Sequence, residues 1–200
     1  MDRERTLELL RGGDEGIAEW NRLIEAGAEI PDLSGVDLRG AKLARVKLRG
    51  AKFSEARLGD SDLEEADLRD ADLSEADLSE AYLMRTDLRK ANLCSADLTG
   101  ADLWRAKLAE ANLTKADLTD ARLYAADLSR ATLFDAEMNR ADFDESDLTE
   151  ANLSEAEMED ADLFAAKAER ARFTNAQLSG ASLNLANLGQ ADLRSREKIT

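Results

Sequence analysis

The chain carries an apolar residue at every fifth position from residue 33 to residue 193. Leucine occupies 27 of these 33 central positions. The exceptions are also apolar, namely Phe53, Met138, Phe143, Met158, Ala168 and Phe173. Two residues before each central position stands alanine in 27 of 33 cases. The five-residue frame runs without a gap over residues 31–195, and Ala66–Glu80 contains three successive copies, ADLRD, ADLSE and ADLSE.

A period of five fits neither regular element. On an α-helix, five residues turn the side chain by roughly 500°, so the leucines would spiral around the axis. In a straight strand, five residues place the side chain on the opposite face. The leucines share one interior only if the chain turns a corner in each unit. We therefore expect a coil with one leucine and one alanine pointing inward per unit, and polar turn-forming residues at the corners.

This pattern resembles the pentapeptide-repeat proteins, whose motif is written A(D/N)LXX. In that family, four of these units make one square, right-handed coil. The resemblance implies an all-β solenoid over residues 31–195, a right-handed quadrilateral β-helix of about eight coils. With strands spaced by about 4.8 Å, the rod would be on the order of 40 Å long.

Residues 1–30 have a helical pattern and predict an N-terminal α-helical cap. A short helix over Glu4–Leu10 is expected to end at Gly12 and Gly13, and Asp14 is a good N-cap for a second. One apolar face of this second helix consists of Ile17, Trp20, Leu23 and Ile24. A helix laid across the first coil would cover its open edge, which otherwise invites aggregation. The alternative is a docking helix for a partner.

The opposite end of the array has no such module. Residues 196–200 form a short polar tail. Either the tail folds over the last coil or a second copy covers it, which makes an end-to-end homodimer through the C-terminal coil a hypothesis.

Composition narrows the class of function. The chain has one cysteine, Cys94, which fits a reducing, cytoplasmic compartment, and it has no histidine. No apolar run approaches the length of a membrane span, and the N-terminus lacks the pattern of a signal peptide. No nucleophile–base pairing, phosphate-binding glycine loop or metal-ligand spacing is present. We expect no catalytic site, cofactor, metal or membrane contact.

Charge is uneven along the chain. The net charge is −16, and residues 59–164 carry 29 acidic and 10 basic side chains. Residues 31–58 carry three acidic and seven basic ones. The sequence thus predicts an acidic rod with mildly basic ends, a surface that disfavours direct nucleic-acid binding.

With four units per coil, equivalent residues four units apart stack into columns along the rod. One predicted column is acidic: Asp77, Asp97, Asp117, Glu137 and Glu157. It is either a docking face or simply the consensus Asp before Leu, hydrogen-bonded at the corner.

A second predicted column is aromatic and consists of Met84, Trp104, Tyr124 and, after Asp144, Phe164, with Tyr82 on the same face. Exposed aromatics beside arginine are typical of interface cores, but the rings also stabilise a coil when they stack on one another. A third column alternates in sign, as an axial ion-pair ladder would: Asp70, Lys90, Glu110, Arg130, Glu150 and Arg170.

The leading hypothesis is a non-enzymatic structural or protein-interaction module that presents the faces of a rod to an unknown protein partner. The alternative comes from the quinolone-resistance branch of the family, whose members resemble B-DNA in shape and charge and bind DNA gyrase. The acidic charge favours that alternative. The lack of projecting loops and of a C-terminal dimerisation helix, and leucine rather than phenylalanine at the centres, oppose it.

Overall fold

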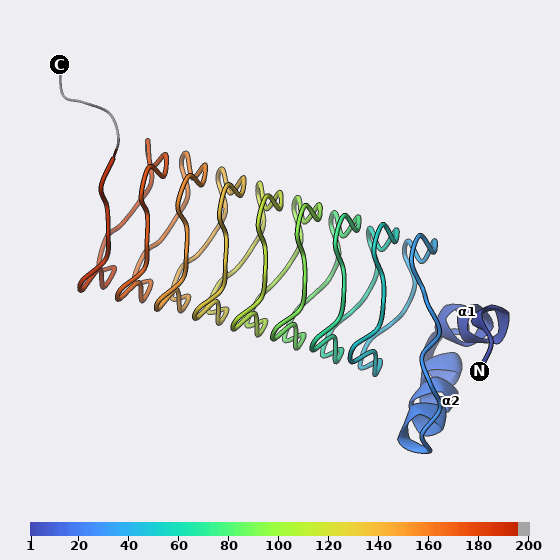
Figure 1. The fold of residues 1–200 in the computed structure, drawn as a ribbon. Coiled ribbons are helices and arrows are strands. Elements are labelled where there is room, and N and C mark those ends of the chain that lie inside the picture. Colours follow the sequence, from blue (N-terminus) through green and yellow to red (C-terminus); the bar gives the residue numbers. More distant parts are fainter. Residues whose placement is uncertain (196–200) are drawn as a thin grey trace.

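The computed structural model describes residues 1–195, and the predicted tail at 196–200 lies outside the described residues. Two helices, α1 (Arg3–Arg11) and α2 (Gly13–Glu25), stand at the N-terminal end of a long array of similar coils (Figure 1). The described C-terminal residues lie at the far end of the rod from the helices.

One coil takes four repeat units. Parallel β-bridges join equivalent residues four units apart throughout the array, from Asp37 and Arg57 to Arg172 and Asp192. A residue with positive φ recurs every five positions from Gly35 to Gln190, so each coil has four corners. The chain is therefore a β-helical solenoid.

The extended segments form isolated bridges, and residues 1–195 contain no continuous strand. The expectation of an all-β solenoid thus needs a correction in its strands, while the solenoid itself is present. A corner in every unit leaves too few extended residues for two consecutive bridges, so each side of the coil pairs through one residue.

Backbone hydrogen bonds tie each unit to both neighbouring coils. Leu63 N–H donates to Tyr82 O at 2.8 Å and Glu65 N–H to Met84 O at 3.0 Å. Asp67 N–H donates in the other direction, to Val46 O at 2.9 Å. The alanine between them, Ala66, closes the corner by donating to Leu63 O at 3.0 Å. An insertion between these donors would shift the hydrogen bonds out of register with the neighbouring coils, in keeping with the unbroken frame.

The third residue of each corner has a φ between 53° and 74°. Such a φ at this position is typical of a type II turn, where glycine is favoured. Of the 32 corners from residue 35 to residue 190, 27 nevertheless have a non-glycine residue there. None of those residues is β-branched, the class for which a positive φ is most costly.

The central leucines fill one continuous core, and the two ends of this core differ in how they are covered. At the N-terminal end, Trp20 is fully buried and its indole N–H donates to Lys47 O of the first coil at 2.8 Å. Ile17 is also buried, and Leu23 and Ile24 pack against the core while partly exposed. At the other end, Leu193 is 50% exposed. The core is thus covered by α2 at one end and, among the described residues, open at the other.

The predicted helix boundaries need one correction. Helix α2 begins at Gly13 with Gly12 as its N-cap, so Asp14 lies in the first turn rather than at the cap. A carboxylate there still interacts favourably with the helix dipole. Asp2 caps α1 instead, accepting a hydrogen bond from Arg5 N–H at 2.8 Å.

Candidate functional site

The aromatic column lies at one corner of consecutive coils. Arg85 N–H donates to Trp104 O at 2.9 Å, and Arg105 N–H donates to Tyr124 O at 3.0 Å, so Trp104 and Tyr124 stack in register. Met84, Trp104 and Tyr124 are each half-buried. Each is the second residue of its corner, a position on the surface of the rod.

Two arginine side chains lie over the Trp104 ring. The guanidinium carbon of Arg105 lies 4.8 Å from the ring centroid and that of Arg85 lies 5.2 Å from it. Arg85 also forms ion pairs with Glu64 and Glu65, both at 3.2 Å. Cation–π contacts at exposed sites contribute about 0.5–1 kcal/mol each. At this corner the guanidinium groups stack on the Trp104 ring, and the ring itself stays half-exposed.

Asp144 interrupts this column between Tyr124 and Phe164. Its Oδ1 atom is buried and has no hydrogen-bond partner within the described residues. Burial and the neighbouring carboxylates of Glu145, Asp142 and Asp162 raise the pKa of Asp144. A hydrogen bond to Glu145 raises the pKa of Tyr124. The C-terminal part of the column thus lies among more carboxylates than the part around Trp104.

The remaining aromatic candidates are more exposed. Tyr82 is 51% exposed and lies on the side next to the corner, bridged to Asp62 and Asp102. Phe164 is 39% exposed. Phe134, also 39% exposed, is an aromatic that sequence reasoning missed. It occupies the same position of its unit as Trp104, half a coil out of phase, and so lies at the opposite corner.

The acidic column is a true column, but its members differ. Bridges join Asp77 to Asp97, Asp97 to Asp117, Asp117 to Glu137 and Glu137 to Glu157. The three aspartates each accept a hydrogen bond from the backbone two residues on, for example from Thr99 N–H to Asp97 Oδ1 at 2.9 Å. This Asx-type contact recurs across the array and gives the consensus Asp a structural task. Glu137 and Glu157 show no such contact.

The alternating column forms ion pairs along part of its length. Lys90 pairs with Glu110 at 3.7 Å, and Glu150 pairs with Arg130 at 3.0 Å and with Arg170 at 3.3 Å. Asp70 pairs instead with Arg49, also at 3.0 Å. Exposed pairs of this kind contribute about 0–1 kcal/mol each. Because these side chains pair with one another, we interpret the column as part of the scaffold and not as a contact surface.

Residues 1–195 contain neither a metal-binding cluster nor a membrane-spanning helix. No group of three or more His, Cys, Asp or Glu side chains is arranged to hold a metal ion within that range. No helix in the described part of the chain is long and apolar enough to cross a membrane.

The repeat itself identifies the family. The chain matches the family described as Pentapeptide repeats, in eight copies, in overlapping stretches that together run from residue 32 to residue 194. The chain belongs to the pentapeptide-repeat family. The prediction made from the A(D/N)LXX pattern is confirmed.

Solved pentapeptide-repeat structures resemble the chain. HetL from the cyanobacterium Nostoc sp. strain PCC 7120, a protein involved in heterocyst differentiation regulation, is 32% identical. The alignment covers 88% of this chain and 94% of HetL, with a TM-score of 0.45. The plasmid-mediated fluoroquinolone resistance protein QnrB1 is 15% identical over 82% of this chain and 91% of its own, with a TM-score of 0.47. No protein with a curated description matches the chain at a significant level.

Proposed function

We propose that this pentapeptide-repeat protein is a non-enzymatic protein-interaction module, and that its contact surface is the corner formed by Met84, Trp104 and Tyr124 with Tyr82 and Phe164 beside it. One observation carries the proposal. The chain has few aromatic residues, and the corner combines half-exposed rings with the guanidinium groups of Arg85 and Arg105. Tryptophan, tyrosine and arginine are the residues that most often dominate binding energy at interfaces.

A capture experiment from the native host tests this proposal. The purified chain is immobilised, and the proteins it retains are compared with those retained by a Trp104→Ala/Tyr124→Ala variant. The variant is expected to lose the retained partner while keeping its circular dichroism spectrum. Phe134→Ala, at the opposite corner, is the matched control and should retain it. Equal capture by both variants would reject the aromatic corner as the contact surface.

The same proposal assigns structural roles to the two ends of a right-handed, quadrilateral array of about eight coils. Residues 1–30 act as the cap, since Trp20 closes the first coil. The exposed Leu193 marks an end that a second copy would cover in an end-to-end dimer. Light scattering tests the dimer, and a monomeric mass at every protein concentration would remove it. We place the protein in the reducing cytoplasm, where its single cysteine stays a thiol.

A second candidate is DNA mimicry directed at DNA gyrase. Its support is a predominantly acidic side of the rod. The segment 34–40 and its equivalents in the following coils, up to 174–180, together carry 15 acidic and four basic side chains. A supercoiling assay with purified gyrase decides this alternative. Inhibition by wild type that weakens in a Glu137→Gln/Glu157→Gln variant supports mimicry, and no inhibition removes it.

A further inference from the structure

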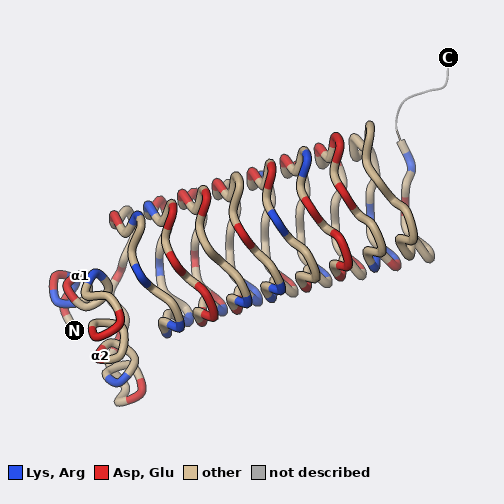
Figure 2. The backbone as a smooth tube through the Cα atoms, turned by 180° about the vertical axis from the view of Figure 1, so that it is seen from behind, with Lys and Arg blue, Asp and Glu red and all other residues tan. Residues whose placement is uncertain are grey.

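Charge is sorted between opposite sides of the first four coils, which the sequence alone did not predict. One side and its corners consist of residues 44–50, 64–70, 84–90 and 104–110 and carry nine basic and six acidic side chains. The opposite side, residues 34–40, 54–60, 74–80 and 94–100, carries two basic and seven acidic ones. We call the former the basic side. In Figure 2 many of the blue segments of these coils gather along one long edge.

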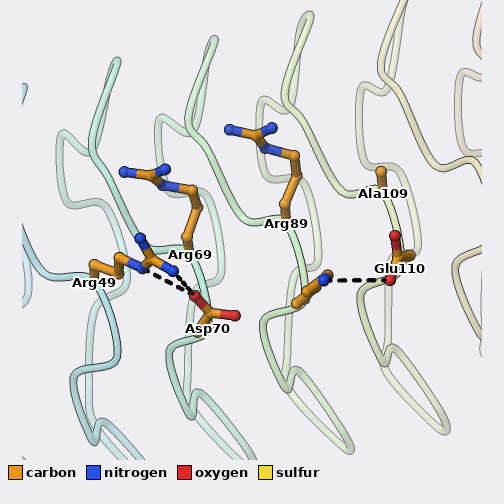
Figure 3. A pocket seen from close by; sticks show the side chains of 7 residues that line it. Arg49, Arg69, Asp70, Arg89, Ala109 and Glu110 are labelled. Atoms are coloured by element: carbon orange, nitrogen blue, oxygen red, sulfur yellow. Dashed lines mark hydrogen bonds and ion pairs between the residues drawn. The ribbon is translucent and has the colours of Figure 1, made fainter.

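Two arginines of the basic side are held rigidly in a row. The guanidinium of Arg69 donates through Nε and Nη2 to Asp67, with the shorter contact at 2.6 Å, and Arg89 contacts Asp87 in the same way. Figure 3 shows these two guanidinium groups extending in the same direction from neighbouring coils, beside the Arg49–Asp70 pair. A guanidinium fixed by one carboxylate loses little further freedom when its remaining N–H groups meet another.

Two other cations of the basic side have no ion-pair partner within the described residues. Arg105 and Lys107 are exposed, and no carboxylate of residues 1–195 lies in ion-pair distance of either one. With Arg69 and Arg85 they line a hollow of about 540 Å³, whose lining also includes the carboxylates of Glu65, Asp67 and Asp87. Arg105 also stacks on Trp104, so the hollow adjoins the aromatic corner.

We propose that the basic side is the docking site for an acidic α-helical segment of the protein partner. Coils repeat about every 4.8 Å along the rod, and carboxylates spaced three or four residues apart on one face of a helix advance by about 4.5–6 Å per step. A helix along the rod can thus present one carboxylate per coil to Arg69, Arg89 and Lys107. A long nucleic acid fits less well, because the same side becomes acidic further along, where Asp144, Glu145, Asp147 and Glu150 follow.

This inference rests on the proposed interaction function and names the chemistry of the partner. Its test uses fluorescent probes of defined composition on the full chain. The first probe is an alanine-rich helical peptide with glutamates along one face, and the second has the same composition scrambled so that the glutamates encircle the helix. The third is single-stranded oligothymidine. Binding is followed by fluorescence anisotropy at low and at physiological salt.

We expect the facial peptide to bind more tightly than the scrambled peptide and the oligonucleotide. An Arg105→Ala/Lys107→Ala variant should weaken that binding roughly tenfold, equivalent to about 1.4 kcal/mol. Lys52→Ala/Arg122→Ala is the matched control. It also removes two exposed cations that have no ion pair in the described part of the chain, but these two lie on other sides of the rod. The affinity of this variant for the facial peptide should change little.

Three outcomes would overturn the inference: no binding at peptide concentrations up to about 1 mM, equal binding of the two peptides, or tighter binding of the oligonucleotide. The two proposals fail separately. If Trp104→Ala/Tyr124→Ala loses partner capture and the wild-type chain binds no peptide, the proposed interaction function stands. Only the acidic helix is then rejected as the partner segment.

Discussion

At the scale of single residues, the repeat consensus assigns each position a physical task. The aspartate before the central leucine accepts a hydrogen bond from the backbone two residues on, as Asp117 does from Thr119 N–H at 2.9 Å. The third corner residue takes a positive φ. Two of the three hydroxyl residues at the alanine position, Ser61 and Thr86, donate to a backbone carbonyl, and the third is informative because it does not.

Ser146 is this third residue. Ser61 and Thr86, buried at the same position of their units, donate to Leu58 O at 2.6 Å and to Leu63 O at 2.7 Å. The buried Oγ of Ser146 has no hydrogen-bond partner among the described residues. Because an unsatisfied buried hydroxyl costs about 1–3 kcal/mol, Ser146→Ala should stabilise the fold by about 1 kcal/mol in urea unfolding.

Ser61→Ala is the control for this prediction. It removes a satisfied hydroxyl and should lower the free energy of unfolding by about 0.5–1.5 kcal/mol. If both substitutions destabilise the protein equally, the Ser146 hydroxyl has a partner in solution.

Asp144 predicts a pH dependence. Its pKa in the folded chain is raised by burial and by Glu145, Asp142 and Asp162. A raised carboxyl pKa means that the folded state holds the proton more tightly, so this group lowers stability as pH rises above the usual aspartate range. Asp144→Asn should therefore raise the melting temperature at pH 7, and the gain should shrink as the pH falls and the wild-type carboxyl takes up its proton.

Thermal melts of both proteins across this pH range test that expectation. Asp97→Asn serves as the comparison, because Asp97 accepts a backbone hydrogen bond at its corner. A gain that is equal at pH 4 and pH 7 would contradict a charge-based cause.

At the scale of elements, α2 and the first coil form one packing unit. Trp20 is fully buried and is fixed by its hydrogen bond to Lys47 O. Asn21 adds two contacts with the same coil, donating to Arg45 O at 2.9 Å and accepting from Lys47 N–H at 2.8 Å. The helix therefore satisfies backbone groups that would otherwise form an open edge.

Trp20→Ala should cost about 3–5 kcal/mol of stability, since it leaves a large cavity and an unpaired carbonyl at the end of the core. Differential scanning calorimetry measures the loss, and light scattering should show concentration-dependent association through the uncovered edge. Trp104→Ala, which removes a half-buried ring, is the control and should cost clearly less. An equal loss in both variants would show that α2 does not close the coil.

At the scale of the whole molecule, the solenoid stacks like charges as readily as unlike ones, because every column repeats at the coil spacing. Glu137 and Glu157 are bridged neighbours, both exposed, with no ion pair in the described part of the chain. Glu150 lies in a similar stack but contacts Arg130 and Arg170.

Glu137→Gln/Glu157→Gln should therefore raise the melting temperature in low salt by roughly 1–3 °C, and added salt should reduce the difference. Glu150→Gln, which removes the same charge from a paired site, should lower the melting temperature. Thermal melts at two salt concentrations measure both effects. A rise in both variants would point to net charge rather than to the local pairing.

The repeat pattern alone predicted the solenoid, its frame and its core, because a leucine at every fifth residue faces one interior only if the chain turns a corner in each unit. It also predicted the columns, including Trp104 beneath Tyr124, once the coil length was taken from the family. The folded structure was needed to recognise the sorting of charge between opposite sides. The basic side consists of residues 44–50, 64–70, 84–90 and 104–110, which follow one another in successive coils, whereas a charge count along the chain averages them with their acidic neighbours. Likewise, only the folded coil shows that Asp97 is engaged at its corner while Arg105 and Lys107 have no ion-pair partner in the described part of the chain. Hydrogen bonding depends on distances that the linear pattern does not contain.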